Sequence, residues 1–383
     1  MDDSVAMQLA LAQACSVEGR TSPRPPVGAV VVRDGHIVGQ GATAPPYGPH
    51  AEVKALEQAG EAARGSVLYV TLEPCCIQVH TPPCTAAIIA SGVSRVVIAV
   101  HDPNPCIYTK GITRLRDAGI DVTLLEDCRE RREAEEIIRP FATYMTHSRP
   151  YVTAKWAMTL DGKLATYTHD ARWISSPDAR SWVHDLRDRV DAILVGAGTT
   201  RADNPRLTVR LDGEQTRAPR SWSPLRVVLS TSGQLPTHLA LLQPGLASGT
   251  CIIVGDTCSH EARQRLSEHG ATVLLSGQLD TNGQIDLQAA LQMLGQRDIM
   301  HVLIEGGARL LGSAFDQHCI DHVAAFVAPK LIGGSGAPSP VAGKGLALMD
   351  HAACLRNARK TLFDADVLIE GDVSYEECND KRG

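Results

Sequence analysis

The sequence predicts a protein of the α/β class with two domains. Its 383 residues are too many for one ordinary domain, because domains usually hold about 100–200 residues. In both halves of the chain, helical patterns alternate with short apolar runs, which is typical of strands covered by helices. A charged stretch ending in His147-Ser148-Arg149-Pro150 separates the halves. We therefore expect one domain over residues 1–147 and a second over residues 148–383.

The first half presents its elements in a regular order. An amphipathic helix is expected over residues 4–18, followed by a proline-rich loop, TSPRPP. The strands VGAVVV and HIVGQG form a hairpin about Arg33-Asp34-Gly35, since Asp-Gly suits a tight turn. The elements that follow are helix His50–Ala59, strand SVLYVTL, helix Thr85–Ser91, strand RVVIAV, helix Gly111–Ala118 and strand IDVTLL. This order predicts an α/β sandwich that closes near residue 125.

A charged segment links the two halves. Residues 126–147 are rich in Arg and Glu, and such a run is usually the exposed face of a helix rather than a binding patch. Pro140 is the position at which this helix could break, because proline lacks the backbone N–H group that continues a helix. The tetrapeptide that follows is interpreted as a hinge.

The second half is predicted to hold a mostly parallel sheet. Its strand candidates are continuous apolar runs, as expected where both faces of a sheet are covered. They are YVTAKWAM, DAILVG, LRVVLS, TCIIVG, ATVLLS, HVLIEGG and HVAAFVAP. The intervening segments Ser176–Arg189, Ser259–His269 and Asp286–Leu294 are helical in pattern, and Gly333–Gly336 is expected to be a surface loop.

Composition excludes several classes of protein. The net charge of -6 argues against broad electrostatic contact with nucleic acid, and 4% aromatic residues argue against a base-stacking surface. No apolar run approaches the roughly 20 residues needed to cross a bilayer. The N-terminus, MDDSVAMQ, carries acids where a signal peptide has bases. We therefore expect a cytoplasmic protein that binds no nucleic acid and no membrane.

One group of residues predicts a zinc site. His50 begins a helix, Cys75 follows a buried strand, and Cys84 begins the next helix. One imidazole and two thiolates suit a tetrahedral zinc ion with an open fourth position, where bound water can lose a proton near neutral pH. Glu52, two residues after His50, can carry protons to and from that water. The pattern H-x-E followed by P-C is the signature of nucleobase deaminases.

A purely structural zinc is the main alternative at this site. It would need a fourth protein ligand, and the sequence offers two candidates, Cys76 and His80. Neighbouring residues rarely both reach one ion, which disfavours Cys76 beside Cys75. The other cysteines, scattered singly, are expected to be small buried side chains, since a cytoplasmic chain does not build a disulfide framework.

The spacing of the cysteines carries a family resemblance. Eight residues, CIQVHTPP, lie between Cys75 and Cys84, where most deaminases of this type have two. With TLEPC, TPPC and HDPNP, this resembles the deaminase half of the bifunctional riboflavin-biosynthesis deaminase/reductase, and the resemblance covers essentially the whole chain. It implies an N-terminal cytidine-deaminase-like α/β/α sandwich that holds zinc through His50, Cys75 and Cys84, with Glu52 as proton shuttle.

The second half resembles the reductase half of the same family. The segments are KWAMTLDGKLAT, RWISSPDAR, VHDLRDRVDAILVGAGTTRADNPRLTVR, VLIEGGARLLGSAF and FVAPKLIGG. The resemblance implies a dihydrofolate-reductase-like α/β domain that uses NADPH. The residues agree with this, because Gly196-Ala197-Gly198-Thr199 and Glu305-Gly306-Gly307-Ala308 follow apolar strands, where small residues let backbone amides approach a phosphate. The Rossmann fingerprint G-x-G-x-x-G is absent from these two turns.

The resemblance also implies a reaction and its residues. The first domain would replace the 2-amino group of a diaminopyrimidinone carrying a ribosylamino 5-phosphate, and the second would pass hydride from NADPH to the opened ribose. NADPH would touch Ala157, Trp173, Thr199, Asp203, Ser230 and the stretch beginning at Gly307. The substrate, a pyrimidine ribosyl phosphate, would meet Arg187, Leu207, Arg210 and Glu305, with the two arginines able to clamp its phosphate. Relatives commonly form dimers or tetramers, so a homo-oligomer is expected.

Departures from the family pattern concentrate in the substrate-reading part of the first domain. Where the family has His-Pro-Asn-Pro, this chain has Ser22-Pro23-Arg24-Pro25, so Arg24 replaces the Asn that would bind the pyrimidine. Thr43 stands where the family has a His, and the loop Cys76–His80 differs in sequence from the family's loop. Outside these positions, Thr109 replaces a Gly of the family. In the second domain, Ala171 replaces a Ser of the family and His169 replaces a Gly.

These departures keep several alternatives open. One is a relative with an altered deaminase pocket that works in a secondary flavin-like or azapteridine antibiotic pathway. Another is a protein in which one domain alone is active. A nucleic-acid deaminase is disfavoured by the acidic balance and the scarcity of aromatics. A zinc-stabilised scaffold is disfavoured by Glu52, because structural zinc needs no proton shuttle.

Overall fold

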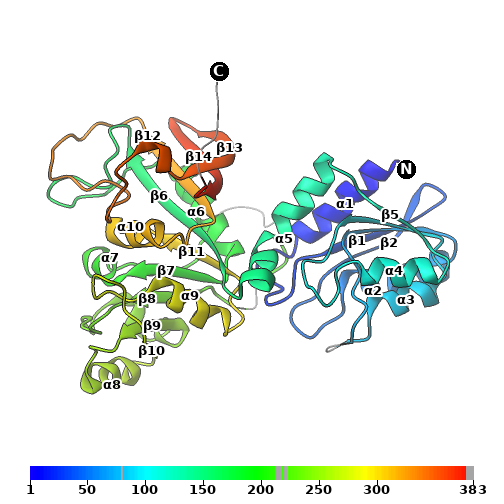
Figure 1. The fold of residues 1–383 in the computed structure, drawn as a ribbon, viewed down its shortest axis with the longest axis horizontal. Helices are drawn as coiled ribbons and strands as arrows, with labels where there is room; N and C mark the ends of the chain where they lie inside the picture. The colour runs from blue at the N-terminus through cyan, green and yellow to red at the C-terminus, as the bar shows by residue number, and fades with distance from the viewer. Residues whose placement is uncertain (79–80, 212–216, 220–221, 377–383) are drawn as a thin grey trace. The chain divides into compact units, whose positions relative to one another are not determined.

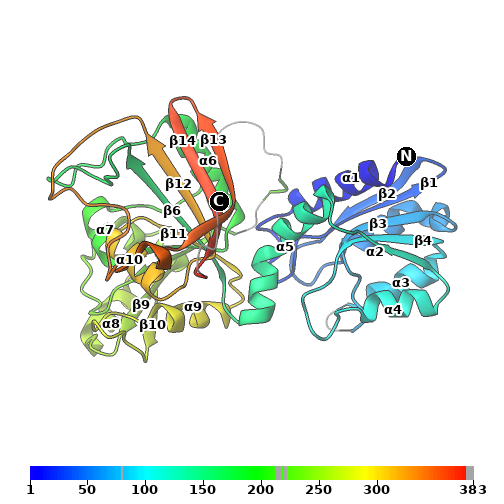
Figure 2. The same cartoon turned by 45° about the horizontal axis from the view of Figure 1, so that its top comes forward.

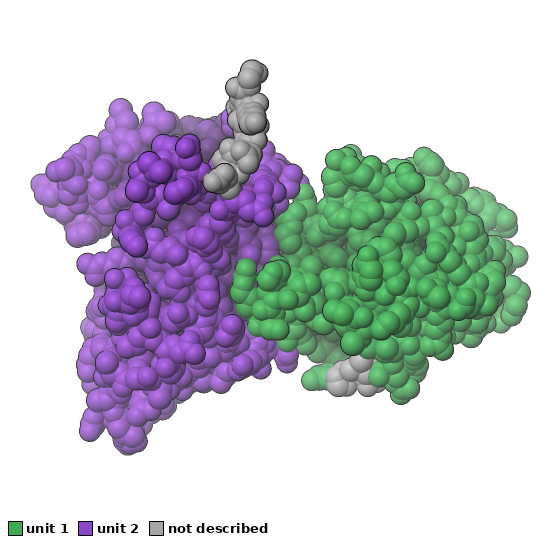
Figure 3. Space-filling model, viewed as in Figure 1, with its two compact units in different colours: residues 1–149, 214–221 green, residues 150–213, 222–383 purple. Residues whose placement is uncertain are grey.

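The chain folds into two compact units. The structure, a computed structural model, describes residues 1–78, 81–211, 217–219 and 222–376. Unit 1 comprises residues 1–149 together with 214–221, and unit 2 comprises residues 150–213 and 222–383 (Figure 3). The boundary predicted after residue 147 lies close to this division. Ser148, at a φ of 53°, ends the last helix of unit 1.

Unit 1 is built on a five-stranded mixed sheet with the order β2-β1-β3-β4-β5. The predicted hairpin is the antiparallel pair β1–β2, and β1 also pairs antiparallel with β3. Strands β3, β4 and β5 are parallel, so their carboxyl ends lie side by side at the same end of the sheet. The bounds are β1 Gly28–Arg33, β2 His36–Ala42, β3 Val67–Leu72, β4 Arg95–Val100 and β5 Asp121–Leu124.

Helices cover both faces of this sheet (Figures 1 and 2). Helices α1 and α5 lie on one face, and α2, α3 and α4 lie on the other. This is the α/β/α sandwich that the resemblance implied. The bounds are α1 Asp3–Cys15, α2 Ala51–Ala59, α3 Cys84–Ser91, α4 Lys110–Asp117 and α5 Arg129–His147.

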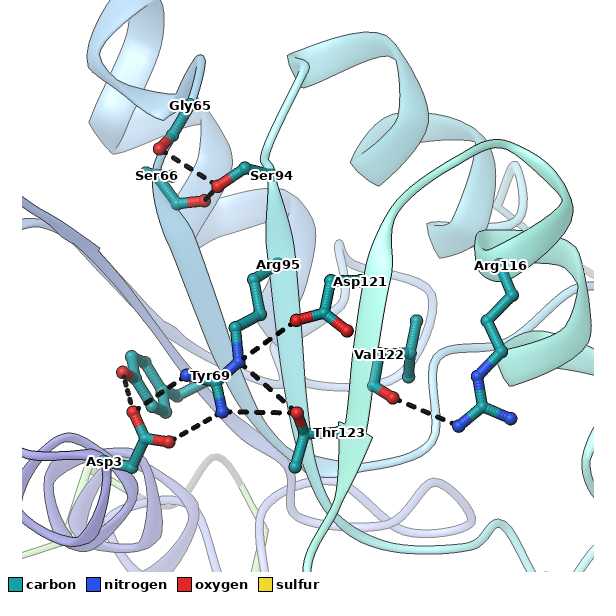
Figure 4. Close-up of polar contacts among 10 residues, drawn as sticks. All are labelled: Asp3, Gly65, Ser66, Tyr69, Ser94, Arg95, Arg116, Asp121, Val122 and Thr123. Carbon is teal, nitrogen blue, oxygen red and sulfur yellow. Dashed lines mark hydrogen bonds and ion pairs between the residues drawn. The ribbon is translucent and has the colours of Figure 1, made fainter.

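A polar cluster ties the start of α1 to the sheet (Figure 4). Asp3 accepts a hydrogen bond from the Tyr69 hydroxyl at 2.6 Å and forms an ion pair with Arg95 at 2.8 Å. Arg95 also reaches Asp121 and Thr123 on the neighbouring strand. The cluster therefore links α1 to three adjacent strands, β3, β4 and β5.

Helix α5 runs through Pro140 without a break, so the break considered at this position is absent. The helix has one apolar side, on which Ala134, Ile138 and Phe141 are buried. An interior proline costs a helix about 3 kcal/mol. Packing of this apolar side against the rest of unit 1 outweighs that cost.

Unit 2 contains a nine-stranded sheet with the order β10-β9-β8-β7-β11-β6-β12-β14-β13. The seven strands from β10 to β12 are parallel, as predicted, and β14 and β13 add an antiparallel edge. The bounds are β6 Tyr151–Thr159, β7 Ala192–Gly196, β8 Leu225–Leu229, β9 Thr250–Gly255, β10 Thr272–Ser276, β11 His301–Glu305, β12 His322–Ala328, β13 Cys354–Phe363 and β14 Asp366–Ser374.

Both faces of the parallel part are buried, because successive side chains of a strand point to opposite faces. On β7, Leu194 joins the apolar cluster beneath α9 and α10, whereas Ile193 joins the cluster beneath α6 and α8. This explains the continuous apolar runs in the sequence. The helices are α6 Pro177–Arg189, α7 Ala197–Asp203, α8 His260–Glu268, α9 Leu287–Gly295 and α10 Ala308–Asp316.

The sequence did not predict the antiparallel edge of unit 2. Strand β13 reads CLRNARKTLF, and most of its residues are exposed. It therefore lacks both an apolar run and a clear alternation, the two signals by which strands are recognised. The short helix α7 was missed as well, since its predicted role was that of a glycine-containing turn.

Candidate active sites

The three predicted metal ligands come together on one side of the sheet of unit 1. His50 is the residue before α2, Cys75 follows β3, and Cys84 is the first residue of α3. Their ligand atoms all lie within 4.8 Å of one another. The His50 Nδ1 atom is 3.1 Å from Cys84 Sγ and 3.7 Å from Cys75 Sγ. In a tetrahedral zinc site, a nitrogen ligand and a sulfur ligand lie about 3.6 Å from each other. The distances between the His50 nitrogen and the two sulfurs therefore fit a zinc ion.

The electrostatic surroundings favour thiolate at Cys75. Its Sγ atom accepts a hydrogen bond from the backbone N–H of Cys84 at 3.3 Å, at the positive end of α3. Hydrogen bonds from Cys84 and His50 lower the pKa of Cys75 to about 4 despite its burial. A deprotonated sulfur is the form that binds metal, so the site is prepared for a cation.

Glu52 lies in the first turn of α2, beside this cluster. Its side chain is only 4% exposed. Burial, and next the charge of Cys75, raise the pKa of Glu52. A buried carboxyl group with a raised pKa can both accept and donate a proton.

A fourth protein ligand is not among the described residues of this cluster, which holds His50, Cys75 and Cys84 alone. Cys76 and His80 were the two candidates for a fourth ligand. Cys76 is half-buried, outside the cluster, and burial raises the pKa of its thiol. His80 lies outside the described residues.

Glu73 anchors the turn that carries Cys75. Its side chain is fully buried, and its carboxylate accepts a hydrogen bond from His101 at 3.0 Å. The same carboxylate accepts from the backbone N–H groups at the start of α4, those of Thr109, Gly111 and Ile112, at 3.0–3.2 Å. Since a carboxylate is stabilised at a helix N-terminus, this contact holds the end of β3 against α4.

Asp102 is a buried acid that the sequence interpretation did not single out. It follows β4, next to the end of β3, and its side chain accepts from the backbone N–H of Asn104 at 2.8 Å. Burial raises the pKa of Asp102 to about 7. The signal was present, because HDPNP follows β4, which pairs parallel with β3, the strand that precedes Cys75.

Two departures from the family pattern are accounted for by backbone contacts. The hydroxyl of Thr43 is buried and accepts a hydrogen bond from the Val27 backbone N–H at 3.1 Å. The guanidinium group of Arg24 donates to carbonyl oxygens of residues 44–48. Both side chains therefore bind their own unit's backbone.

The site of unit 2 is an open cavity of about 1950 Å³. The ten residues proposed from the resemblance for NADPH and for substrate all line it. They are Ala157, Trp173, Arg187, Thr199, Asp203, Leu207, Ser230, Arg210, Glu305 and Gly307. Residues that are far apart in the sequence are therefore brought around one space.

Two glycine-containing turns shape the cavity wall. Gly307 has a φ of +81° and precedes α10, and a Cβ atom there would lie 2.7 Å from Thr199 Oγ1. Gly196 precedes α7 on the neighbouring strand. Bare backbone at two adjacent helix starts suits the pyrophosphate of a dinucleotide, so these residues fit NADPH.

The two arginines expected to clamp a phosphate differ in their surroundings. Arg187 is buried against Glu305, with Nε–Oε1 and Nη2–Oε2 distances of 2.5 and 2.7 Å, and also donates to the Thr208 carbonyl at 2.9 Å. Arg210 is exposed at the cavity, with Nη2 at 3.2 Å from His184 Nε2. Arg210 is thus better situated to meet a phosphate, while Arg187 orients Glu305.

Other cavity residues were missed or altered. Lys155 lies beside the charges of Glu305 and Arg187, and burial lowers its pKa. His169 and Ala171, two departures from the family pattern, also line the cavity. His169 has a φ of +66°, the left-handed conformation that glycine tolerates best.

Comparisons with known proteins define the class of each unit. Residues 1–100 match the cytidine and deoxycytidylate deaminase zinc-binding region, and residues 150–367 match the RibD C-terminal domain. The protein is therefore a zinc-dependent deaminase joined to a reductase.

Relatives along the whole chain identify the family. The riboflavin biosynthesis protein RibD of Aquifex aeolicus is 44% identical over 332 residues, covering 86% of this chain and 88% of that protein. The Synechocystis protein of the same name is 39% identical, covering 97% and 96%. Among solved structures, RibD from Acinetobacter baumannii superposes with a TM-score of 0.83 at 32% identity, covering 97% of this chain and 99% of that one.

A second solved structure agrees with this assignment. The diaminohydroxyphosphoribosylaminopyrimidine deaminase/5-amino-6-(5-phosphoribosylamino)uracil reductase of Thermotoga maritima superposes with a TM-score of 0.80 at 32% identity, covering 97% of this chain and 99% of that one. The chain belongs to the RibD family of bifunctional deaminase/reductases of riboflavin biosynthesis. It uses Zn²⁺ and NADPH, and an alternative role in a secondary pathway is not favoured. No described helix is long and apolar enough to span a membrane.

Proposed function

We propose that unit 1, the domain predicted over residues 1–147, carries out the deamination and that unit 2 carries out the reduction. The gathering of His50, Cys75 and Cys84 within 4.8 Å supports the first assignment most strongly. The cavity lined by all ten expected reductase residues supports the second. The substrate is a pyrimidine ribosyl phosphate, and the two steps act on it in succession.

In unit 1, His50, Cys75 and Cys84 hold zinc. The metal supplies a water molecule that is acidic enough to react near neutral pH. Buried Glu52 takes a proton from the attacking water and delivers a proton to the departing 2-amino group, which leaves as ammonia. Glu73 keeps the Cys75 turn in place through its contacts with α4.

In unit 2, the glycine turns at Gly196 and Gly307 receive the pyrophosphate of NADPH, while Arg210 meets the substrate phosphate. The cofactor supplies a hydride. The ribosylamino ring must first open to an imine, with the ring oxygen taking up the proton that the amino nitrogen gives up. The first carbon of the sugar then accepts the hydride, and the imine nitrogen takes up a proton to complete the ribitylamino chain. Glu305, oriented by Arg187, faces the same cavity as Arg210.

Metal removal tests this division of labour. Chelator treatment should abolish ammonia release from the diaminopyrimidinone phosphate, and added Zn²⁺ should restore it. NADPH oxidation with the already deaminated pyrimidine should persist throughout, because the cavity residues lie in unit 2. Loss of both activities on chelation, with no change in folding, would contradict separate sites.

We further propose that the protein acts in the cytoplasm as a homo-oligomer that binds neither nucleic acid nor membrane. The acidic net charge of -6 supports the absence of nucleic-acid binding. Light scattering after size-exclusion chromatography should give a dimer or tetramer mass. A monomer mass at micromolar concentration would refute the oligomer.

A further inference from the structure

Arg24 is the centre of a set of contacts close to the metal ligands. Its backbone N–H donates to the Thr21 carbonyl at 2.8 Å, and the Thr21 hydroxyl donates to the Arg24 carbonyl at 2.8 Å. From this fixed base, Nη1 donates to Gly48 O at 2.7 Å and Nη2 donates to Ala44 O at 2.7 Å and to Pro45 O. One side chain thus holds three carbonyl groups of one loop.

The loop that Arg24 holds leads directly into the zinc site. Residues 44–49 connect β2 to His50, and the loop is closed by hydrogen bonds from Gly48 N to Pro45 O and from Ala44 N to Pro49 O, at 3.0 and 3.1 Å. A Cβ atom on Gly48 would lie 2.7 Å from the Ala44 Cβ atom. The loop is therefore tightly folded, and its shape determines the position of His50.

Three of the five N–H groups of the Arg24 guanidinium are directed at backbone carbonyl groups. These three groups bind carbonyl oxygens of the loop, whereas the buried Nε has no hydrogen-bond partner among the described residues. The guanidinium charge is nevertheless near enough to interact electrostatically with Cys84 and His50. These contacts suit a side chain that supports the metal ligands, not one that reads a substrate.

We propose that Arg24 is a positioning residue of the deaminase site, which locks the 44–48 loop and so fixes His50 in its ligating position. This inference rests on the proposed zinc-dependent deamination in unit 1. Lysine cannot hold three carbonyl groups in one plane, and glutamine cannot span them, because only the planar guanidinium presents several donors in fixed directions. Partners that orient a metal ligand typically contribute 10- to 100-fold to metal affinity or activity.

The test compares Arg24→Gln and Arg24→Lys with Arg33→Gln. Arg33 serves as the control, because it is an exposed arginine of the same unit, with 46% of its side chain accessible and a single ion pair to Asp34. For each protein, zinc affinity is measured by chelator competition, and ammonia release is resolved into kcat and KM. NADPH oxidation with deaminated pyrimidine is the internal control for unit 2, and thermal melting is the control for folding.

We expect Arg24→Gln to lower zinc affinity and the kcat of ammonia release by about 10- to 100-fold, with KM within about twofold of wild type. Arg24→Lys should recover part of both losses, and Arg33→Gln should change neither. A raised KM with unchanged kcat would overturn the proposal, since Arg24 would then bind substrate. Unchanged zinc affinity and kcat, with or without a lower melting temperature, would overturn it too.

Failure of the proposed function would look different. If wild type releases no ammonia, the deaminase assignment fails, but chelator competition still reports whether Arg24 positions His50. Equal zinc affinity in all four proteins would then refute the positioning role by itself.

Discussion

The two sites are built in opposite ways. In unit 1, three ligand atoms within 4.8 Å come from the starts of two helices and one turn between residues 50 and 84. In unit 2, residues from Lys155 to Lys344 line a cavity of about 1950 Å³. A metal site depends on every ligand, whereas a cavity shares its binding energy among many contacts. Single substitutions should therefore abolish the first activity and only reduce the second.

The sharpest test of this contrast is removal of a zinc ligand. Cys84→Ser should lose zinc and reduce ammonia release by at least about 10³-fold, since the metal contributes several kcal/mol to the reaction. The reduction of deaminated pyrimidine should continue. Metal analysis and both assays measure this, with Cys128→Ser as the matched control. A Cys84→Ser protein that keeps stoichiometric zinc would show that the ligand set is different.

The next largest effect is expected for the proton shuttle. Glu52→Gln keeps the shape of the side chain but cannot accept the proton, so ammonia release should fall by about 10²- to 10⁴-fold. Zinc content should stay at the wild-type level, because Glu52 is not in the ligand cluster. If ammonia release stays near wild type, proton transfer belongs to another group, and buried Asp102 is the first to examine.

In unit 2 the expected effect is smaller. Gly307→Ala places a Cβ atom 2.7 Å from Thr199 Oγ1 at a φ of +81°, and should raise the KM for NADPH by about tenfold. Gly334→Ala is the matched control, because Gly334 has a similar φ of +83° with its nearest contact at 3.9 Å and lies outside the cavity lining. Equal effects of the two substitutions on KM would assign the change to backbone strain alone.

The smallest effect is expected on stability, at Thr109 in unit 1. Like His169 in unit 2, Thr109 replaces a glycine of the family. Thr109 has a φ of +62°, at a position where the family pattern has glycine, and its side chain is exposed. His169, also in place of a family glycine, has a φ of +66°. Thr109→Gly should raise the free energy of unfolding by about 1 kcal/mol, because relief of strain exceeds the added chain entropy. Denaturant unfolding measures it, and a decrease would contradict the strain.

The most specific predictions from the sequence came from local signals. Cys75 and Cys84 follow prolines at strand–helix junctions, which made them stand out as predicted zinc ligands, and the structure brings their ligand atoms and that of His50 within 4.8 Å of one another. The apolar runs predicted the parallel strands of unit 2, because buried strands need apolar side chains on both faces.

Other features depend on contacts that a sequence pattern does not contain. Arg187 and Glu305 are 118 positions apart, and only the fold reveals that they form a buried ion pair. The same holds for the carbonyl groups that Arg24 reaches across 20 to 24 positions. Helix α5 continues through Pro140 because tertiary packing outweighs local preference.

Mass spectrometry of the pyrimidine product tests the central claim, that the protein carries out deamination and reduction as two successive steps. Wild type with zinc and no NADPH should convert the diaminopyrimidinone phosphate to a product heavier by about 1 Da, as an amino group is replaced by oxygen. Adding NADPH should increase the mass by about 2 Da more. A product that gains 2 Da without the first change, or no product at all from zinc-loaded protein, would contradict it.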